Sequence, residues 1–336
     1  MALELKLWGS LALSTRHPNP ISRPLRVIVF AMFGVAMLSG LALADPLDDA
    51  ASALARSDYA TAFDLYRRAA DDGNPQAQYI VGEMYFYGRG AARDRGEAAK
   101  WFRSAADQGL PRAQYTLGSM YLHGDGLPQD GAAAAKWHRL AAEQGDGEAQ
   151  YALALMYFYG RGIVQDYAEA AKWLRKAAEN ERMPSSLDEQ SASYLLGLIY
   201  QSGMGVPTDN VEAAKWFRVA ADKGNAKAEL MLGLAYAGGR GVPQSDADSA
   251  RWFRMAAERG DIQAQRTLGS LYYEGRGVPQ DFVEAHKWLN LAASRLPATN
   301  AARRAEVVKA RDEVAAKMTP EQIAEAQKFA REWTPK

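Results

Sequence analysis

The chain has 336 residues, of which 48% are hydrophobic and 24% are charged, a composition typical of a folded globular protein. Its 40 lysine and arginine residues balance 40 aspartate and glutamate residues, so no overall field favours nucleic acid or an anionic membrane as a partner. The absence of cysteine excludes disulfides, thiolate metal sites and cysteine nucleophiles.

An apolar segment near the N-terminus predicts export. Residues Val27 to Ala44 carry no charged side chain, and they end in the small-residue pattern Ala-Leu-Ala. Three arginines precede the run, namely Arg16, Arg23 and Arg26. We therefore predict a signal peptide of residues 1–44, cleaved after Ala44, and a periplasmic or secreted protein with no membrane insertion after cleavage. If it were left uncleaved, Val27 to Ala44 would instead anchor the chain in the inner membrane.

Six segments of the sequence repeat in one register. They begin at Ala77, Ala113, Ala149, Ala192, Ala228 and Ala264. Each has a tyrosine eight residues after the starting alanine, glycines eleven and thirteen residues after it, and a tryptophan twenty-four residues after it. The tryptophans recur every 36 residues, except for a gap of 43 between Trp173 and Trp216 that indicates a loop insertion near residues 181–190. A period of this length is typical of stacked helix pairs.

Each repeat predicts two helices with a turn between them. In the first repeat Ala77, Val81, Met84 and Tyr85 share one face of a helix, called helix A below. A glycine or alanine in the middle of that face, such as Gly82, indicates close approach of a neighbouring helix. The Gly-x-Gly that follows ends helix A, because glycine readily adopts left-handed conformations.

The second helix of each repeat, called helix B, is predicted to begin at an aspartate. In four repeats a glutamate follows three residues later, which is the pattern of a capping box. These pairs are Asp94 and Glu97, Asp166 and Glu169, Asp209 and Glu212, and Asp281 and Glu284. Helix B also carries the tryptophan, followed by two small residues that leave room for a large side chain from a neighbour.

A single helix pair cannot bury its apolar face, so the repeats must stack and both ends of the array need caps. Residues 45–76 are predicted to form an opening helix, with Leu65 in the register of the tryptophans. Residues 77–299 form the six repeats. Residues 300–336 form capping helices, the last of which starts at Thr319. The predicted fold is an all-α solenoid of six helix-turn-helix repeats of about 36 residues with capping helices.

The Ala-x-x-x-Leu-Gly-x-x-Tyr helix, the Gly-x-Gly loop and the Ala-Lys-Trp helix resemble the Sel-one-like repeat family. The resemblance covers residues 77–295, and Met318 to Ala324 is similar to the closing segment of many bacterial members. The resemblance implies a right-handed solenoid related to the tetratricopeptide repeats. It also implies a role as an adaptor in signalling, envelope assembly or host contact, an expectation that rests on analogy within the family.

The motifs of common enzyme classes are absent from the sequence. No nucleophile-elbow, metalloprotease or phosphate-binding signature occurs, and the Gly-x-Gly segments lack the third glycine and the preceding strand of a dinucleotide site. His123, His138 and His286 lie in different elements of the repeat, whereas a metal site needs convergent ligands. We predict no catalytic, cofactor-binding or metal-binding residues, no cofactor, and no enzymatic activity.

Candidate partner-binding residues lie where the repeat does not fix the side chain. The register tyrosines and tryptophans are predicted to be core. Positions nine and ten after the starting alanine are large in the first three repeats, where they hold Phe86, Tyr87, Leu122, His123, Phe158 and Tyr159. Exposed aromatic residues commonly anchor protein interfaces, so we predict a peptide-binding groove there. Alternatively, these side chains plug the turn between helices A and B of their own repeat.

The sequence therefore predicts a protein-protein interaction scaffold, an adaptor or regulator in the bacterial cell envelope, that holds a protein or peptide on the concave face of the solenoid. The alternative is an envelope hydrolase similar to the beta-lactamases, or a glycan-binding protein, that uses the same groove. An enzyme requires converging titratable side chains, whereas an adaptor requires an apolar or aromatic floor with a polar rim.

The predicted cleavage site is directly testable. N-terminal sequencing of the protein recovered from a bacterial envelope or culture medium should find Asp45 as the first residue. An Ala44→Phe variant should keep its leader, because the peptidase requires a small residue there. A wild-type chain that retains residues 27–44 would support the membrane anchor instead.

Overall fold

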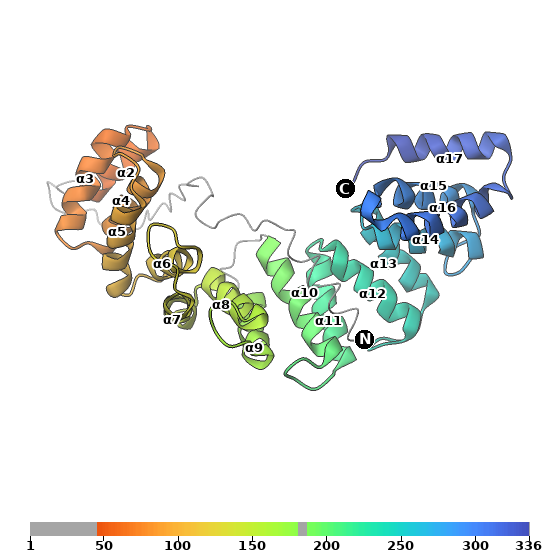
Figure 1. Cartoon of the computed structure of the whole chain (residues 1–336), viewed down its shortest axis with the longest axis horizontal. Helices are drawn as coiled ribbons and strands as arrows, with labels where there is room; N and C mark the ends of the chain where they lie inside the picture. Colours follow the sequence, from red (N-terminus) through yellow and green to blue (C-terminus); the bar gives the residue numbers. More distant parts are fainter. Residues whose placement is uncertain (1–45, 181–186, 336) are drawn as a thin grey trace, which may run out of the picture. The chain divides into compact units, whose positions relative to one another are not determined.

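The computed structural model describes residues 46–180 and 187–335, and every regular element in these ranges is helical (Figure 1). The predicted signal peptide lies outside the described residues. Helix A of the six repeats is α4 (Pro75–Tyr87), α6 (Pro111–His123), α8 (Gly147–Tyr159), α10 (Leu187–Ser202), α12 (Ala226–Gly238) and α14 (Ile262–Glu274). Helix B is α5 (Arg95–Asp107), α7 (Gly131–Glu143), α9 (Tyr167–Ala178), α11 (Asn210–Asp222), α13 (Asp246–Glu258) and α15 (Phe282–Arg295). The six predicted helix pairs are confirmed.

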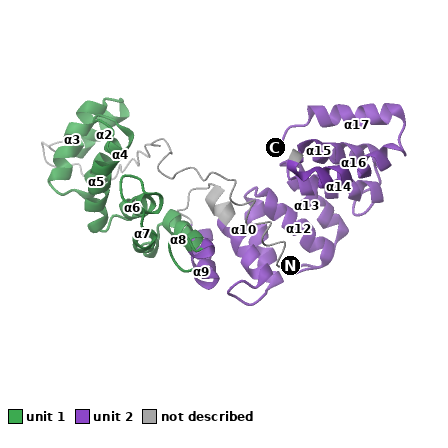
Figure 2. Cartoon of the chain, viewed as in Figure 1, with its two compact units in different colours: residues 1–156, 160–164 green, residues 157–159, 165–336 purple. Residues whose placement is uncertain are grey.

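The chain divides into two compact units (Figure 2). Unit 1 contains the described residues up to Met156 together with Gly160–Val164, and unit 2 contains Tyr157–Tyr159 and the residues from Gln165 onward. The insertion predicted near 181–190 falls partly outside the described residues, but from Leu187 onward it is helix rather than loop. It lengthens α10 to 16 residues, against 13 in α4 or α12.

The Gly-x-Gly turns end helix A as predicted. Gly88 lies in the left-handed region at φ 70°, and its N–H donates to the carbonyl of Met84. Gly90 also has a positive φ, and a Cβ there would overlap the carbonyl oxygen of Tyr59 on α3 (Tyr59–Asp71). The second glycine is thus required twice, once for its own conformation and once for contact with the preceding helix pair.

The capping-box prediction for helix B is only half right. The Asp94 side chain accepts from the N–H groups of Gly96 and Glu97, at 2.8 and 2.9 Å. Its own N–H, which the glutamate of a capping box would accept, donates instead to the carbonyl of Tyr85 on helix A at 3.0 Å. The cap N–H needs no second acceptor, so the glutamate is available for another bond.

In unit 2 that glutamate accepts from the tryptophan one turn further along helix B. Glu212 Oε1 lies 3.0 Å from the indole nitrogen of Trp216, and Glu284 Oε2 lies 2.8 Å from that of Trp288. Burial of an indole N–H costs free energy unless the group is hydrogen-bonded. The glutamate therefore serves the core side chain rather than the cap.

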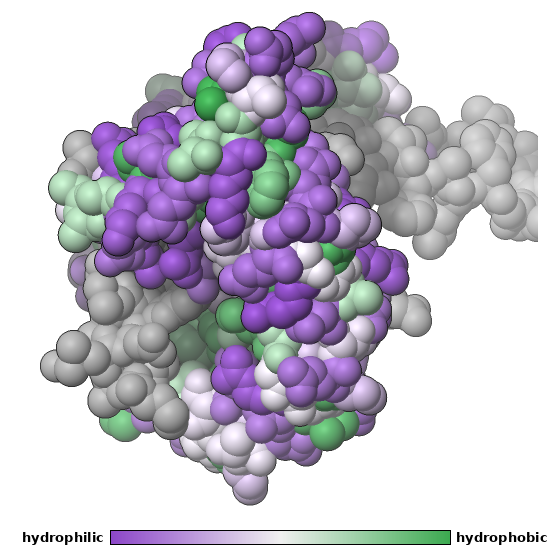
Figure 3. Space-filling view, turned by 90° about the vertical axis from the view of Figure 1, so that its right-hand side faces the viewer, coloured by the Kyte–Doolittle hydropathy of each residue, from purple (hydrophilic) through white to green (hydrophobic). Residues whose placement is uncertain are grey.

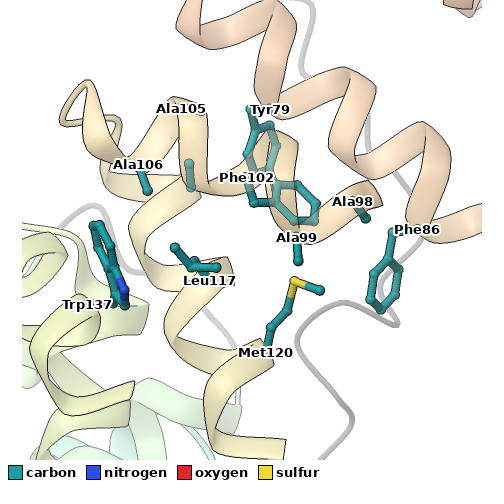
Figure 4. Packing of buried hydrophobic residues seen from close by; sticks show 11 residues of the cluster. Tyr79, Phe86, Ala98, Ala99, Phe102, Ala105, Ala106, Leu117, Met120 and Trp137 are labelled. Atoms are coloured by element: carbon teal, nitrogen blue, oxygen red, sulfur yellow. The ribbon is translucent and has the colours of Figure 1, made fainter. Parts of the chain in front are cut away.

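The small residue in helix A receives a large side chain from helix B of the same repeat. A Cβ at Gly82 would lie 2.7 Å from the ring of Phe102, and Gly233 meets Phe253 at the same distance. In unit 1 the register tryptophan of the next repeat completes the hydrophobic core around these helices, since Trp137 packs with Ala106 (Figure 4). The predicted close approach of the two helices is confirmed, and its reason is the aromatic ring that fills the space.

Five of the six register tryptophans are core as predicted, whereas Trp101 and the register tyrosines are only half-buried. Trp173 and Trp288, for example, are 3% exposed. The hydroxyl of Tyr236 accepts from Arg218 on the preceding helix B at 2.6 Å, and that of Tyr272 accepts from Arg254 at 2.7 Å. These arginine-tyrosine hydrogen bonds therefore join helix B of one repeat to helix A of the next.

The N-terminal cap differs from the prediction. Residues 45–76 were expected to form one opening helix, but the structure has two, α2 (Pro46–Ala55) and α3. Ser57, a non-glycine residue at φ 61°, lies in the turn between them, and the Asp58 side chain caps α3 by accepting from Thr61 N–H. The described part of the chain thus begins with a helix pair, which packs its own small core against α4.

The C-terminal capping helices are confirmed as α16 (Ala301–Ala315) and α17 (Pro320–Glu332). Thr319 and Gln322 form a reciprocal capping box at the start of α17. Both helices pack on α15, and the guanidinium of Arg295 lies 5.0 Å from the ring of Trp333. Figure 3 views the side on which α17 lies in Figure 1, and its surface is mostly hydrophilic with small hydrophobic patches. Among the described residues, no helix is long and apolar enough to cross a membrane.

Comparison of Gly73 with Gly90 distinguishes the conformational role of the second turn glycine from its contact role. Gly73 has φ 92° and open space around its Cβ position, whereas Gly90 has φ 76° and would strike Tyr59. Gly73→Ala should cost about 1 kcal/mol of unfolding free energy through left-handed strain alone. Gly90→Ala should cost about 3 kcal/mol, because overpacking is added. Denaturant unfolding measures both, and equal costs would contradict the contact role.

Candidate functional site

The predicted partner-binding residues separate into two groups according to their position in the repeat. At position nine Phe86 is buried, with 4% of its surface exposed, and the guanidinium of Arg95 on α5 lies 5.1 Å from its ring. Phe158 is half-buried, with its ring 5.3 Å from that of Tyr167 on α9. Each side chain thus contacts the first residue of helix B of its own repeat, close to the turn named in the alternative interpretation. Phe86 must therefore be removed from the predicted contacts.

Leu122, the remaining residue at position nine, is half-buried, and its carbonyl accepts from the side chain of Gln129 in the following turn at 2.9 Å. At position ten the side chains are more open. Tyr87 and Tyr159 are half-buried, and His123 is exposed. The His123 ring donates from Nδ1 to the carbonyl of Ser119 at 2.8 Å when that nitrogen carries the proton. Position ten is thus where side chains remain available to a partner.

In unit 1 a cluster of aromatic and charged side chains surrounds Tyr87. Tyr79, Glu83 and Tyr87 lie four residues apart on α4 and so share one face of the helix. Arg89 follows α4, and Arg112 comes from α6. These five residues are called the Tyr87 surface below; Tyr79 is its buried base, with 4% of its surface exposed, so a partner would contact the other four.

Contacts within the Tyr87 surface link two neighbouring A helices. The Tyr79 hydroxyl donates to Glu83 Oε1 at 3.0 Å. The guanidinium of Arg112 lies 5.3 Å from the ring of Tyr79, and that of Arg89 lies 5.2 Å from the ring of Tyr87. Both distances suit a cation over an aromatic face. The cluster is therefore ordered by contacts between α4, α6 and the intervening turn.

Burial dominates the electrostatics of this cluster. Desolvation raises the pKa of Glu83, while the charge of Arg112, the hydrogen bond from Tyr79 and the charge of Arg89 act in the opposite direction. Desolvation also raises the pKa of Tyr87, and the negative charge of Glu83 adds to that effect. A carboxylate held partly out of water beside arginines and tyrosines is a common feature of functional sites.

The fifth repeat has different residues at these positions. The residues of α12 that correspond to Tyr79, Glu83 and Tyr87 are Leu230, Leu234 and Gly238. Stacking therefore does not require Glu83 or Tyr87. The position of Tyr79 belongs to the core instead, since it is buried in both helices and is also tyrosine in three other repeats, at Tyr115, Tyr151 and Tyr194.

Tyr79, Glu83, Arg89 and Arg112 are not among the contacts predicted from the sequence. A signal was present in the four-residue spacing of Glu83 and Tyr87, at positions that vary between repeats. The three histidines of the described residues are separate, with His123 exposed and His138 and His286 buried. In the ranges the structure describes, no group of three or more histidine, aspartate or glutamate side chains could hold a metal ion.

The fold and this surface define a class of protein, a helical-repeat solenoid whose A helices present side chains that the repeat does not require. The Sel1 repeat pattern matches residues 52–74, 75–110, 111–146, 147–181, 190–225, 226–261 and 262–295. The chain belongs to the Sel1 repeat family, whose members are generally protein-protein interaction scaffolds built on a non-catalytic fold. The first match is shorter than the others and covers the end of α2 and all of α3.

Solved structures include several that are similar. A Sel1 repeat protein from Oxalobacter formigenes is 35% identical, with a TM-score of 0.56, over 74% of this chain and 100% of that one. A protective antigen with an SLR fold from uropathogenic Escherichia coli is 26% identical, with a TM-score of 0.34, over 86% of this chain and 84% of that one. A sel1 repeat protein from Klebsiella pneumoniae is 23% identical, with a TM-score of 0.36, over 61% of this chain and 97% of that one. No curated protein matches the chain.

The electrostatic link between α4 and α6 can be measured at Glu83. Arg112→Met should raise the pKa of Glu83 further, because the charge of Arg112 is the strongest influence that lowers it. Arg89→Met is the matched control and should give a smaller rise, since its effect is the weaker. Carbon-detected NMR titration of the Glu83 carboxyl measures both. No rise in Arg112→Met would mean that the two helices are not coupled there.

Proposed function

We propose that this protein is an exported adaptor or regulator of the bacterial cell envelope that binds a protein or peptide segment through the Tyr87 surface. The observation that carries the proposal is that Glu83, Tyr87 and Arg112 lie on neighbouring helices at positions that vary between repeats, beside Arg89 and the buried Tyr79. Tyrosine and arginine are enriched at the energetic centres of protein interfaces. The apolar run Val27 to Ala44, which ends in Ala-Leu-Ala, supports export.

The arrangement suits recognition more than turnover. Tyr87 offers a large ring with few rotatable bonds, and Arg89 and Arg112 offer planar donor groups for backbone carbonyls or carboxylates of a bound segment. The Glu83 carboxylate would accept a hydrogen bond from an N–H group of the partner or form an ion pair with a cationic side chain of the partner. The proposal requires no cofactor. Leu122, His123, Phe158 and Tyr159 remain predicted contacts in their own repeats.

The test is a comparison of envelope partners captured by the purified, leader-free chain after crosslinking. Tyr87→Ala should reduce capture of a specific protein at least about tenfold, the loss expected when an aromatic anchor worth about 1.4 kcal/mol or more is truncated. Phe329→Ala is the matched control, because Phe329 is an exposed aromatic side chain on α17, with 41% of its surface accessible. Circular dichroism confirms that both variants are folded.

Three outcomes distinguish the adaptor from its alternatives. Loss of one protein partner in Tyr87→Ala alone supports the adaptor. Equal capture by wild type and Tyr87→Ala would rule out the Tyr87 surface as the contact. Recovery of glycan without any protein would favour the carbohydrate-binding or hydrolase alternative.

A further inference from the structure

One core position of helix B carries an unusual side chain in the second repeat. The residue after the register tryptophan is Phe102, Phe217 or Phe253 in three repeats and Leu174 or Leu289 in two others. In the second repeat this position holds His138. It is the side chain that fills the space beside the small residue of helix A, so the repeat requires bulk here and no polar group.

His138 is sealed within the core of unit 1. Its exposed surface is 0%, and a Cβ at Gly118 on α6 would lie 2.9 Å from its ring. The ring of Tyr115, also on α6, lies 5.4 Å away. Neither ring nitrogen has a hydrogen-bond partner among the described residues. A neutral imidazole can occupy this aromatic position, but an imidazolium would bring two N–H donors and a charge without acceptors.

The surroundings of His138 offer no compensation for a positive charge. Desolvation lowers its pKa to about 3, and the charge of His123 on α6 acts in the same direction. Tyr115 contributes an aromatic ring, and Lys136 and Arg139 on α7 itself are cationic. Among the described groups that act on the ring, none is a carboxylate.

We propose that His138 makes the second repeat an acid-sensitive element, in which protonation of the imidazole requires the α6–α7 pair to open and so loosens this repeat selectively as pH falls from 7 to 5. The inference stands apart from the proposed function, because it concerns the stability of one helix pair. Opening would nevertheless displace Arg112, which α6 contributes to the Tyr87 surface.

The sign and size of the effect follow from proton linkage. Exposed histidine titrates near pH 6.5, so between pH 6.5 and 3 the open form binds a proton that the closed form does not. Stability is therefore full above the unfolded pKa and declines as pH falls below it. Between pH 7 and 5 the opening constant of α6 and α7 should rise about 25-fold from this one group.

Hydrogen exchange on the full mature chain tests the proposal. Protection factors of α6 and α7, corrected for the intrinsic rate at each pH, should fall about 25-fold from pH 7 to 5 in the wild type. His138→Phe installs the residue used by three other repeats and should abolish that fall. His138→Leu, the residue of two repeats, gives a second variant should the phenylalanine pack poorly.

His286→Ala is the matched control for loss of a buried histidine elsewhere. His286 on α15 is 3% exposed, and the corresponding residue in the other repeats is alanine, as at Ala99 and Ala214. This variant should keep the wild-type pH dependence of α6 and α7. The proposal is overturned if the wild type shows no added fall at pH 5, or if both His138 variants retain it.

Discussion

Close contact between successive helix pairs is the constraint on which the rest of this structure depends. One helix pair leaves an apolar face uncovered, so its core is completed only when the next pair docks. Docking requires backbone to approach backbone at the turns, where Gly90 lies against Tyr59 and Gly241 against Asn210. A side chain at either glycine would hold the pairs apart. The arginine-tyrosine bonds and the tryptophan knobs can form only after that approach.

Docking also buries polar groups, and the chain pairs several of them with one another. Gln78 donates to the carbonyl of Ala70 at 3.2 Å and accepts from Gln108 at 2.8 Å. In the fifth repeat the same two positions hold Glu229 and Arg259, joined at 2.9 Å with the Glu229 side chain fully buried. A buried ion pair offsets its desolvation less completely than a neutral amide pair. Consistently, burial raises the pKa of Glu229 despite the arginine.

The helix pairs and their boundaries were predictable because their signals repeat in every copy and depend on local physics. The opening turn was not predictable, since it uses Ser57 at a positive φ where the pattern elsewhere uses glycine. The role of Glu212 was assigned wrongly because the competing acceptor for the cap N–H comes from helix A. The contact of Arg112 with Tyr79 joins two repeats, and no pattern within one repeat encodes it.

The positions of the adjacent Phe86 and Tyr87 side chains show why a binding surface on such a repeat array is narrow. Successive residues of a helix point about 100° apart, so one of two adjacent aromatics can face the core while the other faces outward. Phe86 packs with helix B of its own repeat, whereas Tyr87 lies beside Arg89. Stacking fixes every side chain that faces a neighbouring helix. The side chains that stacking leaves to a partner therefore form one stripe of the A helices, where Glu83 and Tyr87 lie on α4.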